Sequence, residues 1–207
     1  MTTKTETKQF QYEIQAYQED CVNNIISLFE SLRQKANFKE VLTAHHKKNK
    51  YNFPVQDTKN IDIMMETGTG KTFTFIKTIF ELSKHFGYKK FIILIPTVPI
   101  REGTKTNLED TKDYFKSLYA NEKEKEIETF VYEGGNISAV RQFIGTSHLS
   151  VLVMTPSSFS HKDNILNRPL EKDINTPELF VNNQEPPKSY LECLKRLNPI
   201  VIMDEPH

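Results

Sequence analysis

The chain has 207 residues, and its 27 lysines and arginines balance 27 aspartates and glutamates, so the formal net charge is zero. This length suits one domain with a sizeable core, and bulk electrostatics favours neither a nucleic acid nor a membrane as partner. No apolar run is long enough for a transmembrane helix, and the polar first residues do not resemble a secretory signal. Two distant cysteines, Cys21 and Cys193, predict neither a metal site nor a disulfide framework, and the expected compartment is a reducing cytoplasm.

Residues 1–60 are predicted to form a helical and loop region, which begins with a polar tail over residues 1–10. Apolar residues recur at helical spacing between about Gln15 and Lys35 and predict an amphipathic helix. Residues 37–60 are polar and predict a loop or a short helix. They contain a basic run at 45–50, for which a solvated surface and a contact with DNA are the two alternatives.

From residue 61 onward, short apolar runs alternate with helical patterns. In chain order we predict a strand at 61–65, a helix to about His85, a strand at 91–95, a helix at 103–119, a strand at 127–132, a helix at 137–145, a strand at 150–154, an irregular insertion at about 160–187, a helix at 188–196 and a strand at 200–203. Continuous apolar strands that alternate with helices are typical of a parallel sheet covered on both faces. The predicted fold class is therefore α/β, with one core over residues 61–207. Because that core ends on a strand, we expect the chain to be part of a longer protein.

The segment between the first predicted strand and helix has the composition of a phosphate-binding loop. It reads Thr67-Gly68-Thr69-Gly70-Lys71-Thr72 and lacks only the first glycine of the strict P-loop pattern. The two glycines allow a tight turn whose N–H groups converge at a helix start, where the helix dipole attracts anions. Lys71 would reach the β- and γ-phosphates of ATP, and the Thr72 hydroxyl would bind Mg²⁺. The alternative interpretation is a glycine turn that carries a surface lysine.

Two carboxylates follow the last predicted strand. Asp204 and Glu205 come directly after the apolar run 200–203, and open α/β sheets bind ligands at the carboxyl ends of their strands. Asp204 would bind Mg²⁺, and Glu205 would orient and activate the attacking water. This interpretation requires the acidic pair to meet the Lys71–Thr72 loop around one nucleotide-bound cation. The alternative is an exposed acidic turn.

The phosphate loop and the ending Asp204-Glu205-Pro206-His207 resemble the motifs of superfamily 2 helicase-type ATPases. Five segments in order, which also include residues 91–96, 100–103 and 157–159, resemble the restriction (Res) subunit of type III restriction–modification enzymes. The resemblance spans about residues 11–207. It implies a RecA-like three-layer sandwich with a mostly parallel sheet, of which this chain would be the first and truncated motor lobe.

The resemblance also implies further roles and partners. Gln18 would read adenine, and His207 would couple the ATP state to a second motor lobe. Five residues would contact the nucleic-acid backbone: Pro96, Thr97, Arg101, Thr155 and Pro156. The parent would be a cytoplasmic prokaryotic enzyme that uses ATP and Mg²⁺ to move on double-stranded DNA, together with a methyltransferase (modification) subunit and without a membrane.

The isolated chain is expected to hydrolyse ATP poorly, since no arginine in it lies in an arginine-finger motif and the resemblance assigns that motif to the second lobe. Two other functions stay open. One is a lobe of another superfamily 2 helicase or translocase that acts on DNA or RNA, and the other is a non-catalytic nucleotide-binding module.

Overall fold

The computed structural model describes residues 12–34, 37–52, 54–55, 59–134, 136–160, 165–170 and 187–205, in two compact units, Met1–Ile63 and Met64–His207. The predicted polar tail, most of the insertion and His207 lie outside the described residues. None of the described helices is both long and apolar enough to cross a membrane.

The first unit contains the helices α1 (Ala16–Gln34) and α2 (Phe38–Asn49). Helix α1 confirms the predicted amphipathic helix, and α2 shows that part of the 37–60 segment is helical. Val41 and Leu42 of α2 are buried against Leu28 of α1, so the two helices share a small apolar core. Asn37 starts α2, since its side chain accepts a hydrogen bond from the N–H of Glu40.

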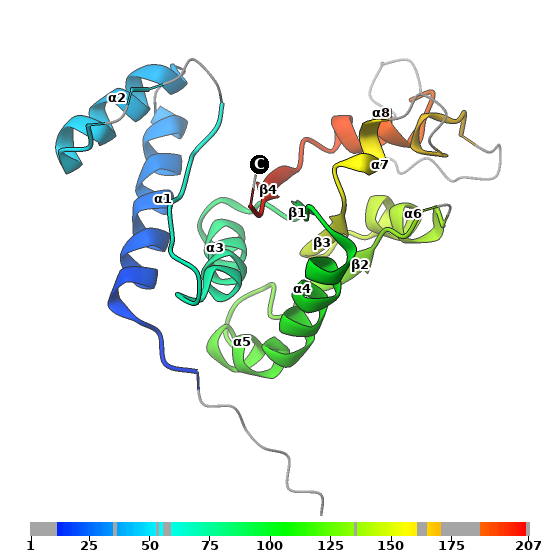
Figure 1. The fold of residues 1–207 in the computed structure, drawn as a ribbon, viewed down its shortest axis with the longest axis horizontal. Coiled ribbons are helices and arrows are strands. Elements are labelled where there is room, and N and C mark those ends of the chain that lie inside the picture. The colour runs from blue at the N-terminus through cyan, green and yellow to red at the C-terminus, as the bar shows by residue number, and fades with distance from the viewer. Residues whose placement is uncertain are drawn as a thin grey trace, which may run out of the picture. The chain divides into compact units, whose positions relative to one another are not determined.

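The second unit is built on a sheet of four parallel strands in the order β2–β3–β1–β4, which confirms the predicted α/β class (Figure 1). The strands are β1 (Lys90–Leu94), β2 (Glu128–Val131), β3 (Ser150–Met154) and β4 (Ile200–Met203). The helix α3 (Lys71–Phe86) precedes β1. Between the strands run α4 (Val98–Asp110), α5 (Lys112–Leu118), α6 (Ser138–Gly145), α7 (Ser157–Ser160), the 3₁₀ turn η1 (Ile165–Asn167) and α8 (Tyr190–Arg196).

Helices cover both faces of the two central strands, with α3 and α6 on opposite sides (Figure 1). On one face, Leu94 and Leu152 pack with Phe143 of α6 and Leu194 of α8 in a single apolar cluster. The alternate strand positions, such as Ile93, face the other way and are also fully buried, as the two-residue period of a strand requires. Burial on both faces explains why the runs at 91–95 and 151–154 are continuously apolar.

Three aromatic rings join α3 to α5. Phe80 stacks on Tyr119 with ring centroids 4.6 Å apart, and it also stacks on Phe115 at 5.2 Å. The Tyr119 hydroxyl donates a hydrogen bond of 2.6 Å to the carboxylate of Glu81 in α3. This packing fixes the helix that begins at the predicted phosphate loop.

The structure corrects two sequence predictions. Residues 61–65 form no strand, and Ile63 and Met64 are 51% and 81% exposed. A strand needs a neighbour for its backbone groups, and no described strand pairs with this run. The single helix predicted over 103–119 is two helices, which start at Val98 and are divided at Thr111.

Candidate functional site

The loop that precedes α3 has the geometry of an anion cradle. Gly68 and Gly70 have φ angles of 82° and 78°, in the left-handed region that glycine adopts without strain. The loop is braced from within, because Thr69 donates from its hydroxyl to the carbonyl of Glu66 at 2.6 Å. Gly70 is the N-cap of α3 and has no side chain that could occupy the first N–H groups, and the first turn of α3 carries no acidic residue. These N–H groups are thus suited to a phosphate.

The acidic pair meets this loop across 134 residues of sequence. Lys71 Nζ lies 3.3 Å from Glu205 Oε1, within hydrogen-bond and ion-pair distance. Their side chains are 31% and 40% exposed, so a ligand can reach both. The structure therefore brings together the lysine and one of the carboxylates that the sequence predicts to share a nucleotide. The backbone of Glu205 is left-handed, with φ 50°, a conformation that costs a residue other than glycine about 1 kcal/mol.

Asp204 lies at the carboxyl end of β4, directly beside β1. Its N–H donates to the carbonyl of Leu94 at 3.0 Å, which continues the pairing of the two strands to the edge of the sheet. Burial raises the pKa of the Asp204 carboxyl above its ordinary value; the Lys71 ammonium opposes this change, and the Glu205 carboxylate adds to it. A carboxylate that is half-buried and close to a second one is a position where a cation would be favourable.

The donor set fits magnesium with ATP as a further ligand. Thr72, on the first turn of α3, and Asp204 offer a hydroxyl and a carboxylate, the hard oxygen donors that Mg²⁺ prefers. No group of three or more histidine, cysteine, aspartate or glutamate side chains within the described residues forms an all-protein metal cage. Mg²⁺ typically needs no such cage, because it keeps waters and binds substrate phosphates.

Four of the predicted nucleic-acid residues follow the ends of two further strands. Pro96 and Thr97 come after β1, and Thr155 and Pro156 come after β3. Since all strands are parallel, these residues lie at the same edge of the sheet as Asp204. Their placement suits contact with a ligand, and their role in binding DNA stays a prediction.

Arg101, the fifth of these residues, is held inside the protein. Its side chain is 10% exposed, and its guanidinium donates to the carbonyl of Tyr132 and to the carboxylates of Glu102 and Glu133, at 3.1–3.3 Å. These bonds tie the first turn of α4 to the residues after β2. The sequence could not reveal this arrangement, since the acceptors come from a loop thirty residues away.

Gln18 lies in the first unit and is 6% exposed. Its side-chain oxygen accepts a hydrogen bond of 3.1 Å from the N–H of Gln15, which is the arrangement of a capping box at the start of α1. Its predicted contact with adenine stays a prediction. His207, the predicted coupling residue, lies outside the described residues.

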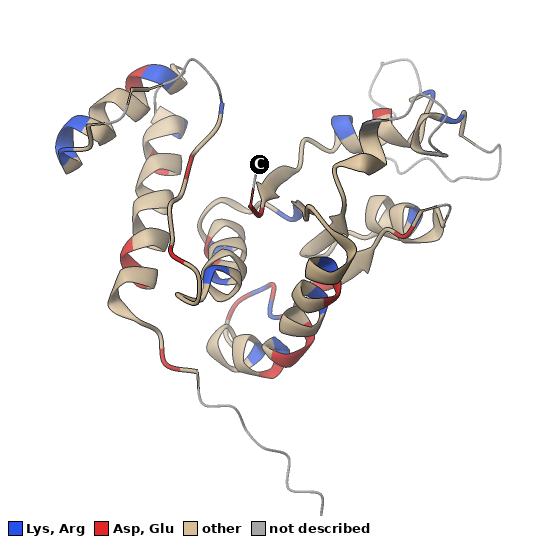
Figure 2. Cartoon of the chain, in the orientation of Figure 1, with Lys and Arg blue, Asp and Glu red and all other residues tan. Residues whose placement is uncertain are grey.

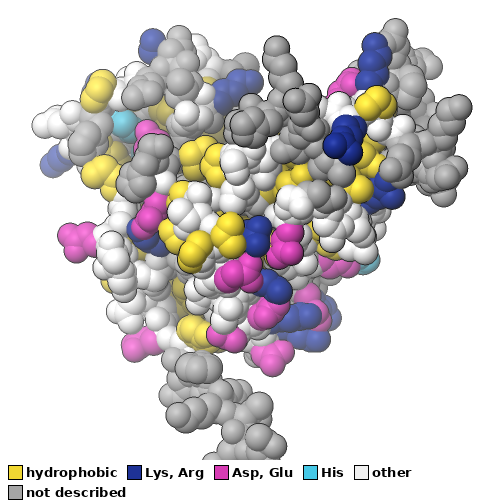
Figure 3. Space-filling view, turned by 45° about the vertical axis from the view of Figure 1, so that its right-hand side comes forward, with side chains coloured by type: hydrophobic (Ala, Val, Ile, Leu, Met, Phe, Trp, Pro, Cys, Tyr) yellow, Lys and Arg dark blue, Asp and Glu magenta, His cyan; other side chains and the backbone are white. Residues whose placement is uncertain are grey.

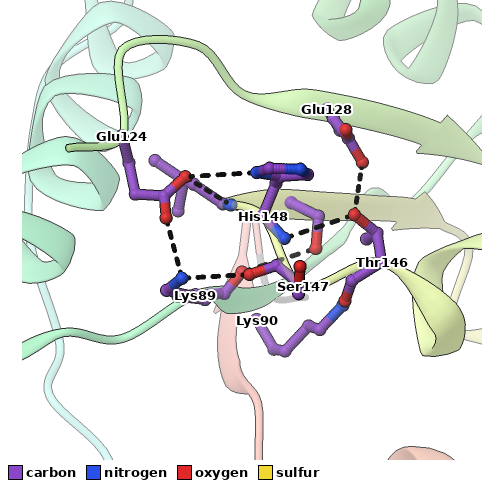
Figure 4. Close-up of polar contacts among 9 residues, drawn as sticks. Lys89, Lys90, Glu124, Glu128, Thr146, Ser147 and His148 are labelled. Atoms are coloured by element: carbon purple, nitrogen blue, oxygen red, sulfur yellow. Dashed lines mark hydrogen bonds and ion pairs between the residues drawn. The ribbon is translucent and has the colours of Figure 1, made fainter. Parts of the chain in front are cut away.

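A second polar cluster lies at the opposite, amino-terminal edge of the sheet (Figure 4). Lys90 Nζ donates to the carbonyls of Phe143 and Thr146 and so closes the carboxyl end of α6. Lys89 pairs with Glu124 at 2.8 Å, and Glu124 also accepts from the N–H of Leu149 at 3.2 Å. Every member drawn has a protein partner, so this cluster holds the starts of the strands together and is not a second candidate site.

An open groove of about 680 Å³ runs along β2, between α4 and α6. Its lining includes Leu108, Phe130 and Gln142, and β2 and β4 are the two opposite edges of the sheet. This groove is therefore separate from the Lys71–Glu205 site.

Comparison with known proteins supports the sequence resemblance. Residues 11–207 match the protein family described as the type III restriction enzyme, res subunit. The chain is 34% identical over 165 residues to the EcoP15I Res subunit from Escherichia coli, which is 71% of this chain and 16% of that protein. It is 35% identical over 177 residues to the EcoPI Res subunit from Escherichia phage P1, which is 78% of this chain and 17% of that protein. The StyLTI Res subunit from Salmonella typhimurium is 28% identical over 166 residues. The chain thus spans about one sixth of the length of these relatives.

Proposed function

Because the chain belongs to the family of type III restriction enzyme Res subunits, we propose that it is the ATP-binding first motor lobe of an ATP-dependent DNA translocase and endonuclease. The observation that supports the proposal is the 3.3 Å contact between Lys71 and Glu205, the lysine of the predicted phosphate loop and the predicted catalytic carboxylate. DNA and a modification subunit are the proposed partners of the whole protein.

The proposed chemistry divides binding from water activation. The N–H groups at the start of α3 and the Lys71 ammonium would hold the β- and γ-phosphates. Thr72 and Asp204 would hold the magnesium ion, which neutralises charge on the phosphates when it is bound. Glu205 would accept a proton from the water that attacks the γ-phosphorus, while the bond to the β-phosphate oxygen breaks and ADP leaves.

The Lys71–Glu205 pair must open for this reaction. A triphosphate carries several negative charges and competes with one carboxylate for the lysine. When Lys71 turns to the phosphates, Glu205 loses its partner and becomes available to the water.

The test uses a protein that carries this chain together with the rest of a Res subunit. We expect Lys71→Ala to abolish DNA-stimulated ATP hydrolysis, since the phosphates lose their charge partner. Glu205→Gln should keep nucleotide binding and lose hydrolysis, because the two steps use different groups. Wild-type hydrolysis in Glu205→Gln would show that another residue activates the water. ATP binding without DNA-stimulated turnover in the unsubstituted protein would favour a non-catalytic nucleotide-binding module.

A further inference from the structure

The carboxyl end of α2 concentrates positive charge in a chain whose net charge is zero. We define the α2 basic end as His45, His46, Lys47, Lys48 and Lys50. The apolar residues of α2 pack against α1, which leaves the three lysines exposed to solvent. In Figure 2 this end of α2 is blue without red beside it on the helix.

These lysines differ in their partners from three exposed lysines of the second unit, Lys84, Lys112 and Lys116, each of which pairs with a glutamate. Among the described residues, no ion pair joins Lys47, Lys48 or Lys50 to a carboxylate. In the second unit, Lys112 and Lys116 both pair with Glu126, at 3.0 and 2.5 Å. Figure 3 shows such mixing, with acidic and basic side chains side by side at the lower right of that face. The α2 basic end is therefore a local positive surface whose lysines form no ion pair within the described part of the chain.

The backbone holds this surface in a defined shape. Lys50 is left-handed, with φ 57°, and its N–H bonds back to the carbonyls of His46 and Lys47. The N–H of Tyr51 donates to the carbonyl of His46 at 2.9 Å, and the Tyr51 ring lies edge-on to the His46 ring at 5.7 Å. The chain thus folds over the helix end and keeps Lys50 beside Lys47 and Lys48.

The charge of the surface acts on its own histidine. Burial lowers the pKa of His45, and the neighbouring His46 and Lys48 lower it further. Cations near the carboxyl end of a helix also interact favourably with the helix dipole, and this stabilisation could explain the presence of one or two lysines there. Three exposed lysines within four residues, with no acidic partner in the described ranges, exceed what this explanation requires.

We propose that the α2 basic end binds the phosphate backbone of double-stranded DNA, an inference that rests on the proposed DNA-directed function. The surface offers ammonium groups and an aromatic hydroxyl, with Tyr51 45% exposed, and these groups fit phosphates rather than base edges. It would strengthen binding without reading sequence, and it supplies the local attraction that a neutral chain lacks overall.

The experiment compares two triple variants of the full chain that carry the same change in net charge. One is Lys47→Gln, Lys48→Gln and Lys50→Gln. The matched control is Lys84→Gln, Lys112→Gln and Lys116→Gln, which removes three lysines that are paired with glutamates. Binding of a fluorescent duplex of arbitrary sequence is followed by anisotropy over a range of salt concentrations, and circular dichroism checks that all variants are folded.

Three phosphate contacts contribute about 2.7 to the slope of log affinity against log salt, or roughly 40-fold in affinity between about 50 and 200 mM salt. We expect the α2 variant to lose most of this slope, the control to keep it, and a Lys47→Arg, Lys48→Arg and Lys50→Arg variant to retain it. Equal slopes in the α2 variant and the wild type, or equal losses in both glutamine variants, would overturn the proposal.

Two further outcomes would also count against it. If the wild-type chain does not bind the duplex at low salt, the proposed contact between α2 and DNA is excluded. The proposed motor function is tested separately, by ATP turnover. Binding to phosphatidylserine vesicles as tight as to duplex, with the same dependence on the three lysines, would assign the surface to another polyanion.

Discussion

From the ion pair between Lys71 and Glu205 we predict that a substitution of Glu205, the proposed catalytic residue, strengthens nucleotide binding. If the pair competes with the triphosphate for the lysine, then Glu205→Gln should bind nucleotide more tightly than the wild type. The pair is 3.3 Å long, and both side chains are roughly one third exposed. Exposed ion pairs contribute about 0.2–1 kcal/mol, so we expect affinity to rise by about 1.4- to 5-fold. A Lys71→Ala chain should lose roughly 10- to 150-fold, as expected when a hydrogen bond to a charged group is removed.

The assay is equilibrium titration of the chain with a non-hydrolysable ATP analogue and Mg²⁺, so that blocked hydrolysis cannot imitate tight binding. Glu66→Gln is the matched control, because it removes the same charge beside the loop from a residue that forms no ion pair with Lys71 among the described contacts. The gain in Glu205→Gln should shrink as salt is added, since exposed pairs are screened. Weaker binding in Glu205→Gln than in the wild type, or a gain no larger than in Glu66→Gln, would refute competition for the lysine.

Three further predictions concern the framework of the site. Phe143→Ala should lower the free energy of unfolding in urea by about 3–5 kcal/mol, because the Phe143 ring is fully buried. Val201→Ala is the control and should change this free energy little, because Val201 is half-exposed. Equal effects of the two substitutions would contradict the described core. Burial lowers the pKa of Lys90 to about 8, so between pH 8 and about pH 10 the unfolded state binds more protons than the folded state. The stability of the wild type should therefore rise over this range relative to that of a Lys90→Met variant. A difference in melting temperature between the two proteins that stays flat or falls would exclude this. Gly68→Ala should cost about 1–2 kcal/mol of stability and weaken binding of the ATP analogue, because a φ of 82° is strained for alanine. The strain comes from the backbone alone, since no atom lies within 4 Å of the added Cβ. An unchanged affinity would show that the loop conformation does not matter for binding.

Much of the second unit follows from local sequence pattern. The runs at 91–95 and 151–154 are apolar at every position, and both become central strands buried on two faces. The position of Glu205 follows from a topological rule, because parallel strands present their carboxyl ends, and the loops after them, at one edge. Lys71 follows no described strand, so its place at that edge depends on the packing of α3. The sequence pattern alone could thus predict the edge at which Glu205 lies, although not which atoms it would touch.

Arg101 illustrates what the sequence could not predict. Its position one turn into a helix after a strand suits a contact with DNA, and the resemblance implies that role. In the structure the guanidinium bonds to Tyr132 and Glu133, which follow a different strand, and its contact with DNA stays a prediction. Residue type and motif position predict that a charged group is near the ligand edge, but the direction of a long side chain depends on acceptors that tertiary packing supplies.

A comparison of the 61–65 run with β4 distinguishes two conditions for a buried strand, which are apolar character and a neighbouring strand. β4 is apolar throughout and 61–65 is apolar except for Asp62, and apolar character is a local property that the sequence reveals. β4 is a strand because β1 supplies the partners for its backbone, whereas 61–65 has no described strand beside it. Even β4 is paired along one edge only, and its Val201 and Met203 side chains are 52% and 50% exposed although their in-register partners Ile92 and Leu94 are buried. Apolar character thus shows which segments can join a sheet, and the availability of a neighbour decides which of them do. For this reason the phosphate loop could be predicted from residue types, while the conformation of the segment that leads into it could not.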